Sequence, residues 1–274
     1  MNKIPFFKMS GSGNDFIVID NREKIIPDEN ISDFIVGICR RKMSVGSDGL
    51  ILIENTGGAD FKWRFYNSDG SVAEMCGNGA RCAARFALIN RIAGADMTFQ
   101  TLAGTISAQV RDKLVKINVP NPTDLNLDYP VELQGGPLMV SSVNTGVPHV
   151  VIPVKDVERA EVFEVGREIR YHQKFAPAGT NVNFMSARGG SQIAIRTYER
   201  GVEDETLACG TGAIAGAIVA ALKFNKKSPV DVVTRSGGHL FIYFKAAAGG
   251  FDEVFLEGDA RVIYRGELCE EAWA

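Results

Sequence analysis

The chain has 274 residues, of which 45% are hydrophobic and 23% are charged, and its formal net charge is −3. These proportions are ordinary for a globular protein and exclude collagen-like, coiled-coil and intrinsically disordered chains. At roughly 100 to 200 residues per domain, the length is sufficient for two domains. Because the charge provides no basic surface for a polyanion, we expect no nucleic-acid partner.

Short apolar runs, several of them alternating with polar residues, predict β-strands along most of the chain. The predicted strands are 16–20, 50–54, 61–66, 114–119, 193–197, 230–234, 240–244 and 254–256. Helical spacing of apolar residues predicts helices over 31–41, 80–92, 162–171 and 213–224. Most strands follow one another without an intervening helix, so the pattern indicates an α+β fold with mainly antiparallel sheet.

The start of the chain does not resemble a signal peptide, because Lys3, Lys8 and Asp15 interrupt its apolar residues. The longest apolar stretch, 213–222, is much shorter than the roughly twenty residues that a membrane span needs. We therefore expect a cytoplasmic protein with no membrane partner. The five cysteines are an odd number in a long chain without an export signal, which favours reduced thiols over a disulfide framework.

A short pattern occurs once in each half of the chain, just before a predicted helix of small residues. The first copy is Cys76-Gly77-Asn78-Gly79-Ala80 and the second is Cys209-Gly210-Thr211-Gly212-Ala213. Between them, 118–130 contains three prolines and several Asn and Asp residues, so it cannot form a central strand. We place a domain boundary there and interpret the repeated pattern as an internal duplication.

The repeated pattern provides both an anion site and a reactive sulfur. Glycines let the backbone approach a ligand, and the first amides of a helix have no partner within the helix. With the positive end of the helix dipole, these amides suit a carboxylate or phosphate and favour a thiolate. If the two halves face each other, one thiolate could remove the α-proton of an amino acid while the other thiol protonates the opposite face. The pattern therefore favours a racemase or epimerase without a cofactor.

The other cysteines, Cys39, Cys82 and Cys269, are interpreted as packing residues, because a cysteine that forms no disulfide is commonly a small buried hydrophobe. The three histidines show no metal-ligand spacing with cysteines or carboxylates. We therefore expect no metal site.

Further motifs accompany the repeated pattern in a fixed order. They are Gly-Ser-Gly-Asn-Asp-Phe at 11–16, Asn-Ser-Asp-Gly-Ser at 67–71, Gly-Val-Pro-His at 146–149, Asn-Val-Asn-Phe at 181–184, Tyr-Glu-Arg-Gly at 198–201 and Glu-Thr-Leu-Ala-Cys-Gly-Thr-Gly at 205–212. With them, the chain resembles the diaminopimelate epimerase family over nearly its whole length. The resemblance implies two pseudo-symmetric domains, each a mainly antiparallel, barrel-like sheet wrapped around a central helix. These would be residues 1–119 with about 263–274, carrying Cys76, and residues 120–262, carrying Cys209.

The resemblance also implies an activity and a set of site residues. The enzyme would be a PLP-independent homodimer that interconverts LL- and meso-2,6-diaminopimelate, a precursor of lysine and peptidoglycan. Cys76 and Cys209 would transfer the protons, in agreement with the argument from the repeated pattern. The residues assigned to substrate are Gly77, Asn78, Gly210 and Thr211 for the reacting carboxylate, Asn14 and Glu199 for the reacting amino group, and Asn67, Asn181 and Arg200 for the far end. His149 and Glu205 could support the site.

Two positions depart from the family pattern, and both are associated with substrate contacts. Family members often carry Asn where this chain has Val147, and some carry Gln where it has Gly49. The pocket could therefore accept a different amino acid.

Two alternatives to this activity stay open. One is a two-cysteine racemase of another amino acid, such as proline, hydroxyproline or histidine, and the other is a thiol-redox or carboxylate-binding protein. A redox role more often uses Cys-x-x-Cys, which this chain lacks. The sequence assigns no role to Glu203 and Asp204.

Overall fold

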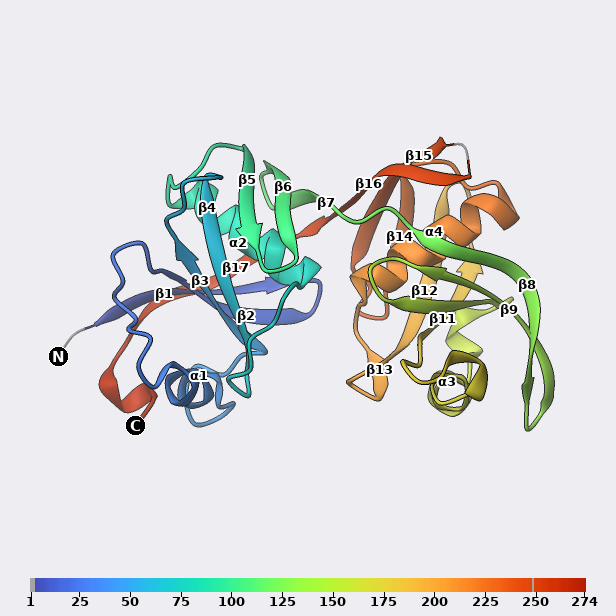
Figure 1. Cartoon of the computed structure of the whole chain (residues 1–274), viewed down its shortest axis with the longest axis horizontal. Coiled ribbons are helices and arrows are strands. Elements are labelled where there is room, and N and C mark those ends of the chain that lie inside the picture. Colours follow the sequence, from blue (N-terminus) through green and yellow to red (C-terminus); the bar gives the residue numbers. More distant parts are fainter. Residues whose placement is uncertain (1–2, 248) are drawn as a thin grey trace. The chain divides into compact units, whose positions relative to one another are not determined.

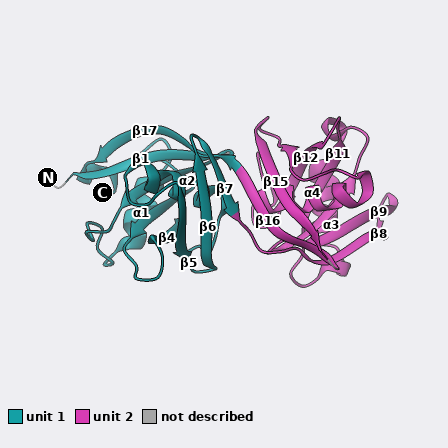
Figure 2. Cartoon of the chain, turned by 90° about the horizontal axis from the view of Figure 1, so that it is seen from above, with its two compact units in different colours: residues 1–117, 258–274 teal, residues 118–257 magenta. Residues whose placement is uncertain are grey.

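The structure is a computed structural model and describes residues 3–247 and 249–274. The chain divides into two compact units, Met1–Ile117 with Gly258–Ala274 and Asn118–Glu257 (Figure 2). Figure 1 shows the strands and helices of each unit in the colours of the sequence. None of the helices in the described ranges has the length and apolarity needed to cross a bilayer.

Unit 1 is a sheet with one helix inside it and one outside. Its strands are β1 (Ile4–Gly11), β2 (Asn14–Asp20), β3 (Gly49–Glu54), β4 (Phe61–Asn67), β5 (Asp96–Thr101), β6 (Gly104–Arg111), β7 (Leu114–Asn118) and β17 (Arg261–Leu268), and its helices are α1 (Ile31–Cys39), α2 (Gly77–Ile89) and the 3-10 helix Glu270–Ala272. Neighbours pair in the order β17, β1, β2, β3, β4, β5, β6, β7. Because α2 contacts β1, β2 and β3 as well as β6, the sheet curves around this helix.

Unit 2 repeats this arrangement. Its strands are β8 (Thr123–Leu133), β9 (Gly136–Asn144), β10 (Pro148–Pro153), β11 (Asn181–Ala187), β12 (Gln192–Glu199), β13 (Asp204–Thr206), β14 (Val230–Val233), β15 (His239–Ala247) and β16 (Gly250–Asp259), and its helices are α3 (Val162–Arg170), α4 (Gly210–Phe224) and the 3-10 helices Val157–Arg159 and Gln173–Phe175. Neighbours pair in the order β8, β9, β10, β11, β12, β14, β15, β16, and the short β13 is added beside β12. Helix α4 contacts β9 to β12, β14 and β15, and so lies inside this sheet.

The two sheets have the same sequence of parallel and antiparallel neighbours. In unit 1 the parallel pairs are β2 with β3 and β4 with β5, and all others are antiparallel. In unit 2 the corresponding parallel pairs are β10 with β11 and β12 with β14. A helix lies in each of these four crossovers, since parallel neighbours need a long connection. The matching topologies confirm the predicted α+β fold with two pseudo-symmetric domains.

In each unit, a strand covered by helices on both faces is buried along most of its length. All six residues of β3 are buried, because α1 covers one face of this strand and α2 the other. Ile35 and Ile38 of α1 pack with Leu50 and Leu52 of β3 in one apolar cluster. In unit 2, α3 covers β11 and β12 in the same way. A strand with helices on both faces does not show the alternation of a half-exposed strand. In β3 the buried residues form a continuous apolar run up to Glu54, whereas β11 also contains the buried Asn181 and Asn183.

The predicted strands and helices lie within or close to observed ones, but several strands were missed. These are β1, β5, β6, β8, β9, β10, β11, β13 and β17. The predicted helices at 80–92 and 213–224 begin earlier, at Gly77 and Gly210, so the glycines belong to the first turns. Pro130 lies within β8, whose described ladder has β9 as its neighbour, in agreement with the exclusion of a central strand here.

Candidate functional site

Cys76 lies at the open end of the central helix of unit 1. Its backbone is extended (φ −146°, ψ 118°), and its carbonyl accepts the first bond of the helix from the Ala80 N–H at 2.8 Å. Cys76 is therefore the N-cap, and the amides of the following residues point out of the helix end without intrahelical partners. The first turn of α2 contains no acidic side chain. The half-buried sulfur thus lies beside a group of amides suited to an anion.

Cys209 occupies the same position in unit 2. Its backbone is extended (φ −120°, ψ 114°), and its carbonyl accepts from the Ala213 N–H at 2.9 Å. Its sulfur lies 3.5 Å from the Thr211 hydroxyl, and the residue is 7% exposed. A Cβ at Gly212 would lie 2.3 Å from Asn183 Oδ1 and 3.3 Å from the Cys209 sulfur. Only glycine therefore fits at this close approach of helix and strand.

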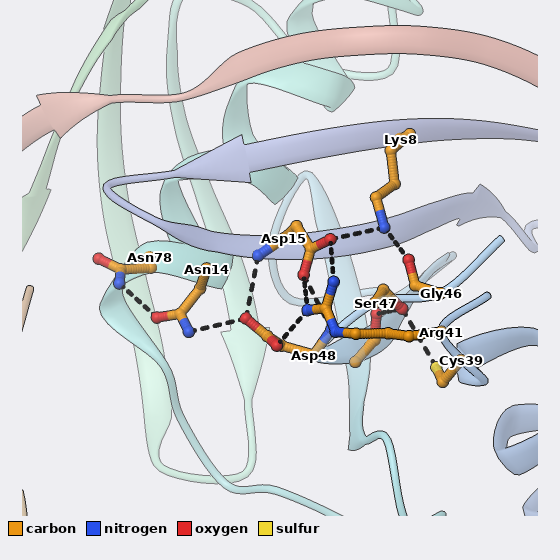
Figure 3. Close-up of polar contacts among 10 residues, drawn as sticks. Lys8, Asn14, Asp15, Cys39, Arg41, Gly46, Ser47, Asp48 and Asn78 are labelled. Carbon is orange, nitrogen blue, oxygen red and sulfur yellow. Dashed lines mark hydrogen bonds and ion pairs between the residues drawn. The ribbon is translucent and has the colours of Figure 1, made fainter. Parts of the chain in front are cut away.

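Asn14 and Asn78 are brought together at the start of α2. Asn78 is buried in the first turn, and its Nδ2 donates to Asn14 Oδ1 at 2.7 Å. Asn14 Nδ2 in turn donates to Asp48 Oδ2 at 2.9 Å (Figure 3). Two predicted substrate contacts of unit 1 therefore form one polar cluster with a carboxylate to which the sequence analysis assigned no role.

Unlike Asn14 and Asn78, Asn67 lies in an exposed turn at the end of β4. Its Nδ2 donates to Ser71 Oγ at 3.0 Å, and its carbonyl accepts from the Gly70 N–H, where φ is 83°. The turn therefore needs glycine at position 70. The bonds of Asn67 stay within its own turn, a common role of Asn in such a position.

Asn181 and Arg200 are linked in unit 2. Asn181 is buried; its Oδ1 accepts from the Arg200 backbone N–H at 2.9 Å, and its Nδ2 donates to the Pro148 carbonyl at 3.1 Å. The guanidinium of Arg200 donates to the Ala178 carbonyl at 3.1 Å. Asn181 therefore joins the start of β10 to the residue that follows β12, and so fixes the backbone that carries Arg200.

Burial shifts the pKa values of two titratable groups near Arg200, namely Glu199 and His149. Burial raises the pKa of Glu199, whose Oε2 accepts from the Thr206 hydroxyl at 2.8 Å. Burial, with a contribution from the Arg200 charge, lowers the pKa of His149 to about 3. Nδ1 of His149 lies 3.1 Å from Asn183 Nδ2, which donates, so the ring proton is on Nε2. Nε2 is buried and has no partner among the described residues. His149 is thus neutral at pH 7.

Glu205 and Glu203 each form an ion pair with an arginine. Glu205 accepts from Arg196 Nε and Nη2, each at 2.6 Å, in a bidentate pair. Glu203 accepts from the Gly201 N–H at 3.0 Å and pairs with Arg170 of α3 at 3.0 Å. The bonds of Glu203 tie α3 to the turn between β12 and β13, which gives a role to a residue that the sequence left unassigned.

The two positions that depart from the family pattern lie at strand starts. A Cβ at Gly49 would lie 2.3 Å from the Tyr66 carbonyl oxygen in β4, so any side chain there would require the strand to move. Val147 is half-buried, and its carbonyl accepts from the Thr145 N–H at 3.1 Å. The Thr145 hydroxyl donates to the Thr211 carbonyl at 3.0 Å, so this loop contacts the start of α4.

The remaining cysteines differ in their surroundings. Cys39 and Cys82 are buried; burial raises the pKa of Cys39 and raises that of Cys82 to about 12. Both agree with the predicted packing role. Cys269 is exposed, so the expectation that it is a buried hydrophobe is wrong. It lies between β17 and the last 3-10 helix.

Arg81 is fully buried in α2 and was not among the predicted site residues. Its Nη2 donates to Asn78 Oδ1 at 2.8 Å and to Ser12 Oγ at 2.7 Å, and its Nε donates to the Asp259 carbonyl at 3.3 Å. A sequence signal existed, because an arginine among the small residues of Gly79-Ala80-Arg81-Cys82-Ala83 needs buried partners if that part of the helix is buried. Asp48 gave no such signal, since an Asp before a strand is common in turns.

Comparison with solved structures identifies the class of fold. A phenazine biosynthesis protein of the PhzF family from Bacillus anthracis matches with a TM-score of 0.75 and 16% identity, covering 98% of this chain and 100% of that chain. A probable proline racemase from Agrobacterium radiobacter K84 matches with a TM-score of 0.68 and 13% identity, covering 97% and 93%. The chain therefore has the duplicated α+β fold that these proteins share.

Sequence comparison identifies the family within this class. The family described as Diaminopimelate epimerase matches residues 6–122 and 141–263. Diaminopimelate epimerase from Aquifex aeolicus is 49% identical, covering 97% of this chain and 98% of the relative, and that from Methanocella arvoryzae is 40% identical, covering 98% of each. The chain belongs to the diaminopimelate epimerase family, a family of isomerases, which confirms the resemblance seen in its motifs.

Proposed function

We propose that this protein interconverts LL- and meso-2,6-diaminopimelate without a cofactor. The observation that carries the proposal is the repeated helix start, in which a cysteine caps the first turn in each unit. The identity of 49% to a relative named for this activity, over nearly the whole of both chains, supports the choice of substrate.

In the proposed reaction, one thiolate takes the α-proton and the other thiol gives its proton to the opposite face of the same carbon. The C–H electron pair stays on the substrate as a carbanion until the second proton arrives, so the stereocentre is inverted. The amides at the starts of α2 and α4, at Gly77, Asn78, Gly210 and Thr211, hold the reacting carboxylate and stabilise its growing charge. After one turnover the two sulfurs have exchanged protonation states, and the enzyme is ready for the product isomer.

The proposed substrate contacts follow from the chemistry of the ligand. Asn14 and Glu199 supply acceptor oxygens for the reacting ammonium group. Arg200, together with Asn67 and Asn181, binds the far end; a guanidinium has five donors, and the bond to Ala178 uses one of them. Asn181 contributes by fixing the Arg200 backbone.

His149 and Glu205 would support the site without touching the proton that moves. A neutral His149 offers its Nε2 proton as a donor in a buried position of unit 2. Glu205 would act through Arg196, whose pairing holds β12 to β13. We also propose that the protein is a cytoplasmic homodimer, as the family resemblance implies. Sedimentation equilibrium tests the oligomeric state, and a mass of one chain would refute the dimer.

The proposal is tested by incubating the reduced protein with LL-diaminopimelate in D2O. We expect deuterium at one α-carbon with inversion of that centre. Cys76→Ser and Cys209→Ser should each lower the rate by about 10²- to 10⁴-fold, the usual contribution of an acid or base. Cys269→Ser, at an exposed thiol, is the matched control and should keep the parent rate. Absence of exchange by the parent would refute the epimerase, and parental exchange in both serine variants at 76 and 209 would favour the thiol-redox or carboxylate-binding alternative.

A second variant separates this substrate from those of related racemases. Amino acids such as proline, hydroxyproline and histidine have no distal carboxylate. Arg200→Met should therefore abolish turnover of diaminopimelate, whereas a racemase of those amino acids would keep its activity. Assaying the parent and the variant with each of these substrates distinguishes the two functions.

A further inference from the structure

The side chains around the first turn of α2 form a chain of hydrogen bonds that runs from Arg81 to Asp48. Arg81 Nη2 donates to Asn78 Oδ1 at 2.8 Å, and Asn78 Nδ2 donates to Asn14 Oδ1 at 2.7 Å. Asn14 Nδ2 completes the chain by donating to Asp48 Oδ2 at 2.9 Å. Figure 3 shows the part from Asn78 to Asp48 and the ion pairs beyond it.

The two ends of this chain determine how both asparagine amides are oriented. A guanidinium can only donate hydrogen bonds, and an ionised carboxylate can only accept them. The oxygen of Asn78 must therefore face Arg81, and its nitrogen must face Asn14. The nitrogen of Asn14 must face Asp48, which leaves its oxygen toward the first turn of α2, where Cys76 is the N-cap.

Each end of the chain is itself held by other groups. Arg81 is fully buried, and it also donates to Ser12 Oγ at 2.7 Å. Asp48 Oδ1 accepts from Arg41 Nη2 at 2.7 Å. Asp48 Oδ2, the oxygen bound to Asn14, also accepts from the Asp15 backbone N–H at 3.2 Å. The carboxylate therefore cannot turn without breaking bonds on both of its oxygens.

We propose that Asp48 and Arg81 are positioning residues that hold the Asn14 oxygen toward the reacting ammonium group of the substrate. This inference rests on the proposed function, in which Asn14 contacts that group. An amide oxygen has two lone pairs; Asn78 occupies one, and the second accepts an N–H of the ammonium. If the amide of Asn14 were reversed, it would present an NH2 group to a cation and weaken its binding.

The isosteric substitution Asp48→Asn and the truncation Asp48→Ala together test the orientation. The oxygen of the new amide would take the place of Oδ2, because two donors, Asn14 Nδ2 and the Asp15 N–H, face that position. Only Arg41 faces the other position, and it is exposed and also pairs with Asp15. Asn14 therefore keeps its orientation in Asp48→Asn. Asp48→Ala removes the acceptor, so the Asn14 amide is no longer held with its oxygen toward the helix start.

We therefore expect Asp48→Ala to raise KM and Asp48→Asn to keep it near the parent value. Asp48→Ala should raise KM for LL-diaminopimelate by about 10- to 100-fold, the range for a hydrogen bond to a charged group. The ammonium is present in substrate and transition state alike, so kcat should change much less than KM. Asp20→Ala is the matched control: its carboxylate also pairs with an arginine, Arg22, and its side chain is 35% exposed against 37% for Asp48. This control should keep the parent KM.

A double-mutant cycle with Asn14→Ala supplies the second measurement. Without the Asn14 amide there is nothing for residue 48 to orient, so Asp48→Asn or Asp48→Ala should add little to the KM of Asn14→Ala. The inference is overturned if KM effects at 14 and 48 multiply independently, or if Asp48→Asn raises KM as much as Asp48→Ala. Should Asp48→Asn fail to fold, the cycle with Asp48→Ala still decides. A parent that exchanges no deuterium would instead refute the proposed function itself.

Discussion

Replacing His149 by glutamine should remove a large pH-dependent contribution to the free energy of unfolding. His149 is fully buried in β10, and burial lowers its pKa to about 3. An unfolded histidine titrates near 6.5. Between these two values the unfolded chain binds a proton at this residue that the folded chain does not.

The sign and the size of the effect follow from this difference. The stability that neutral His149 provides is complete above about pH 6.5 and is lost as the pH falls, because proton uptake favours the unfolded state. Each pH unit below about 6.5 costs about 1.4 kcal/mol, so the loss is about 3 kcal/mol at pH 4.5. Down to the folded pKa of about 3 it amounts to about 5 kcal/mol.

Urea unfolding of the parent and of His149→Gln at pH 7.5, 6.5, 5.5 and 4.5 measures this contribution. The difference at pH 7.5 reports the change in packing alone, and the parent should lose about 3 kcal/mol relative to the variant by pH 4.5. Ile152→Val, at another buried position of the same strand, lacks a titratable group and should show a constant difference. A parent-minus-variant difference for His149→Gln that stays constant with pH would show that the folded protein protonates this imidazole, and would refute the reasoning.

Three further outcomes are expected. Gly49→Ala should destabilise unit 1 by about 1 to 3 kcal/mol in urea unfolding, because the Cβ would lie 2.3 Å from the Tyr66 carbonyl; an equally stable variant would mean that β4 moves easily. Glu203→Gln should cost about 1 kcal/mol through its half-buried pair with Arg170, and Arg170→Gln should add little in the same background; additive costs would contradict a shared pair. Iodoacetamide at pH 8 should alkylate the exposed Cys269 and leave Cys82 unmodified until denaturant is added, since burial raises the pKa of Cys82 to about 12; peptide mapping that finds native Cys82 labelled would refute this.

The helix starts could be predicted from the sequence because their signals are local. Cys-Gly-x-Gly-Ala marks an N-terminus through backbone freedom and small size, and both copies occupy the N-cap and first turn. Local signals also sufficed for strands such as β3 and β4, whose apolar runs are buried as expected. The fold class followed from these elements, since helices were few and strands adjacent.

Some of the missed strands have buried polar residues whose partners lie outside the strand. In β11, Asn181 and Asn183 are both buried. Asn183 donates to the Val150 carbonyl at 2.8 Å and accepts from the Thr197 hydroxyl at 2.9 Å, partners supplied by β10 and β12. No window of sequence around β11 contains these partners, so its polar residues indicate a loop until the sheet is assembled. Asp48 was missed for the same reason, because its bond to Asn14 joins the starts of β2 and β3.

The two helix starts also show how one backbone arrangement has been supported by different side chains. Beneath Gly79 of α2 the nearest atom belongs to Ile51 of β3, whereas beneath Gly212 of α4 it belongs to Asn183 of β11. Two residues beyond each of these glycines, α2 carries the buried Arg81 and α4 the buried Ile214. The buried polar side chain is thus Arg81 of the helix in unit 1 and Asn183 of the strand in unit 2. Each of these buried polar groups has its own partners. Arg81 donates to Asn78 and Ser12, and Asn183 donates to the Val150 carbonyl and accepts from Thr197. The buried polar contacts near the helix starts therefore differ between the two units, whereas the cysteine and glycine positions of the repeat are the same.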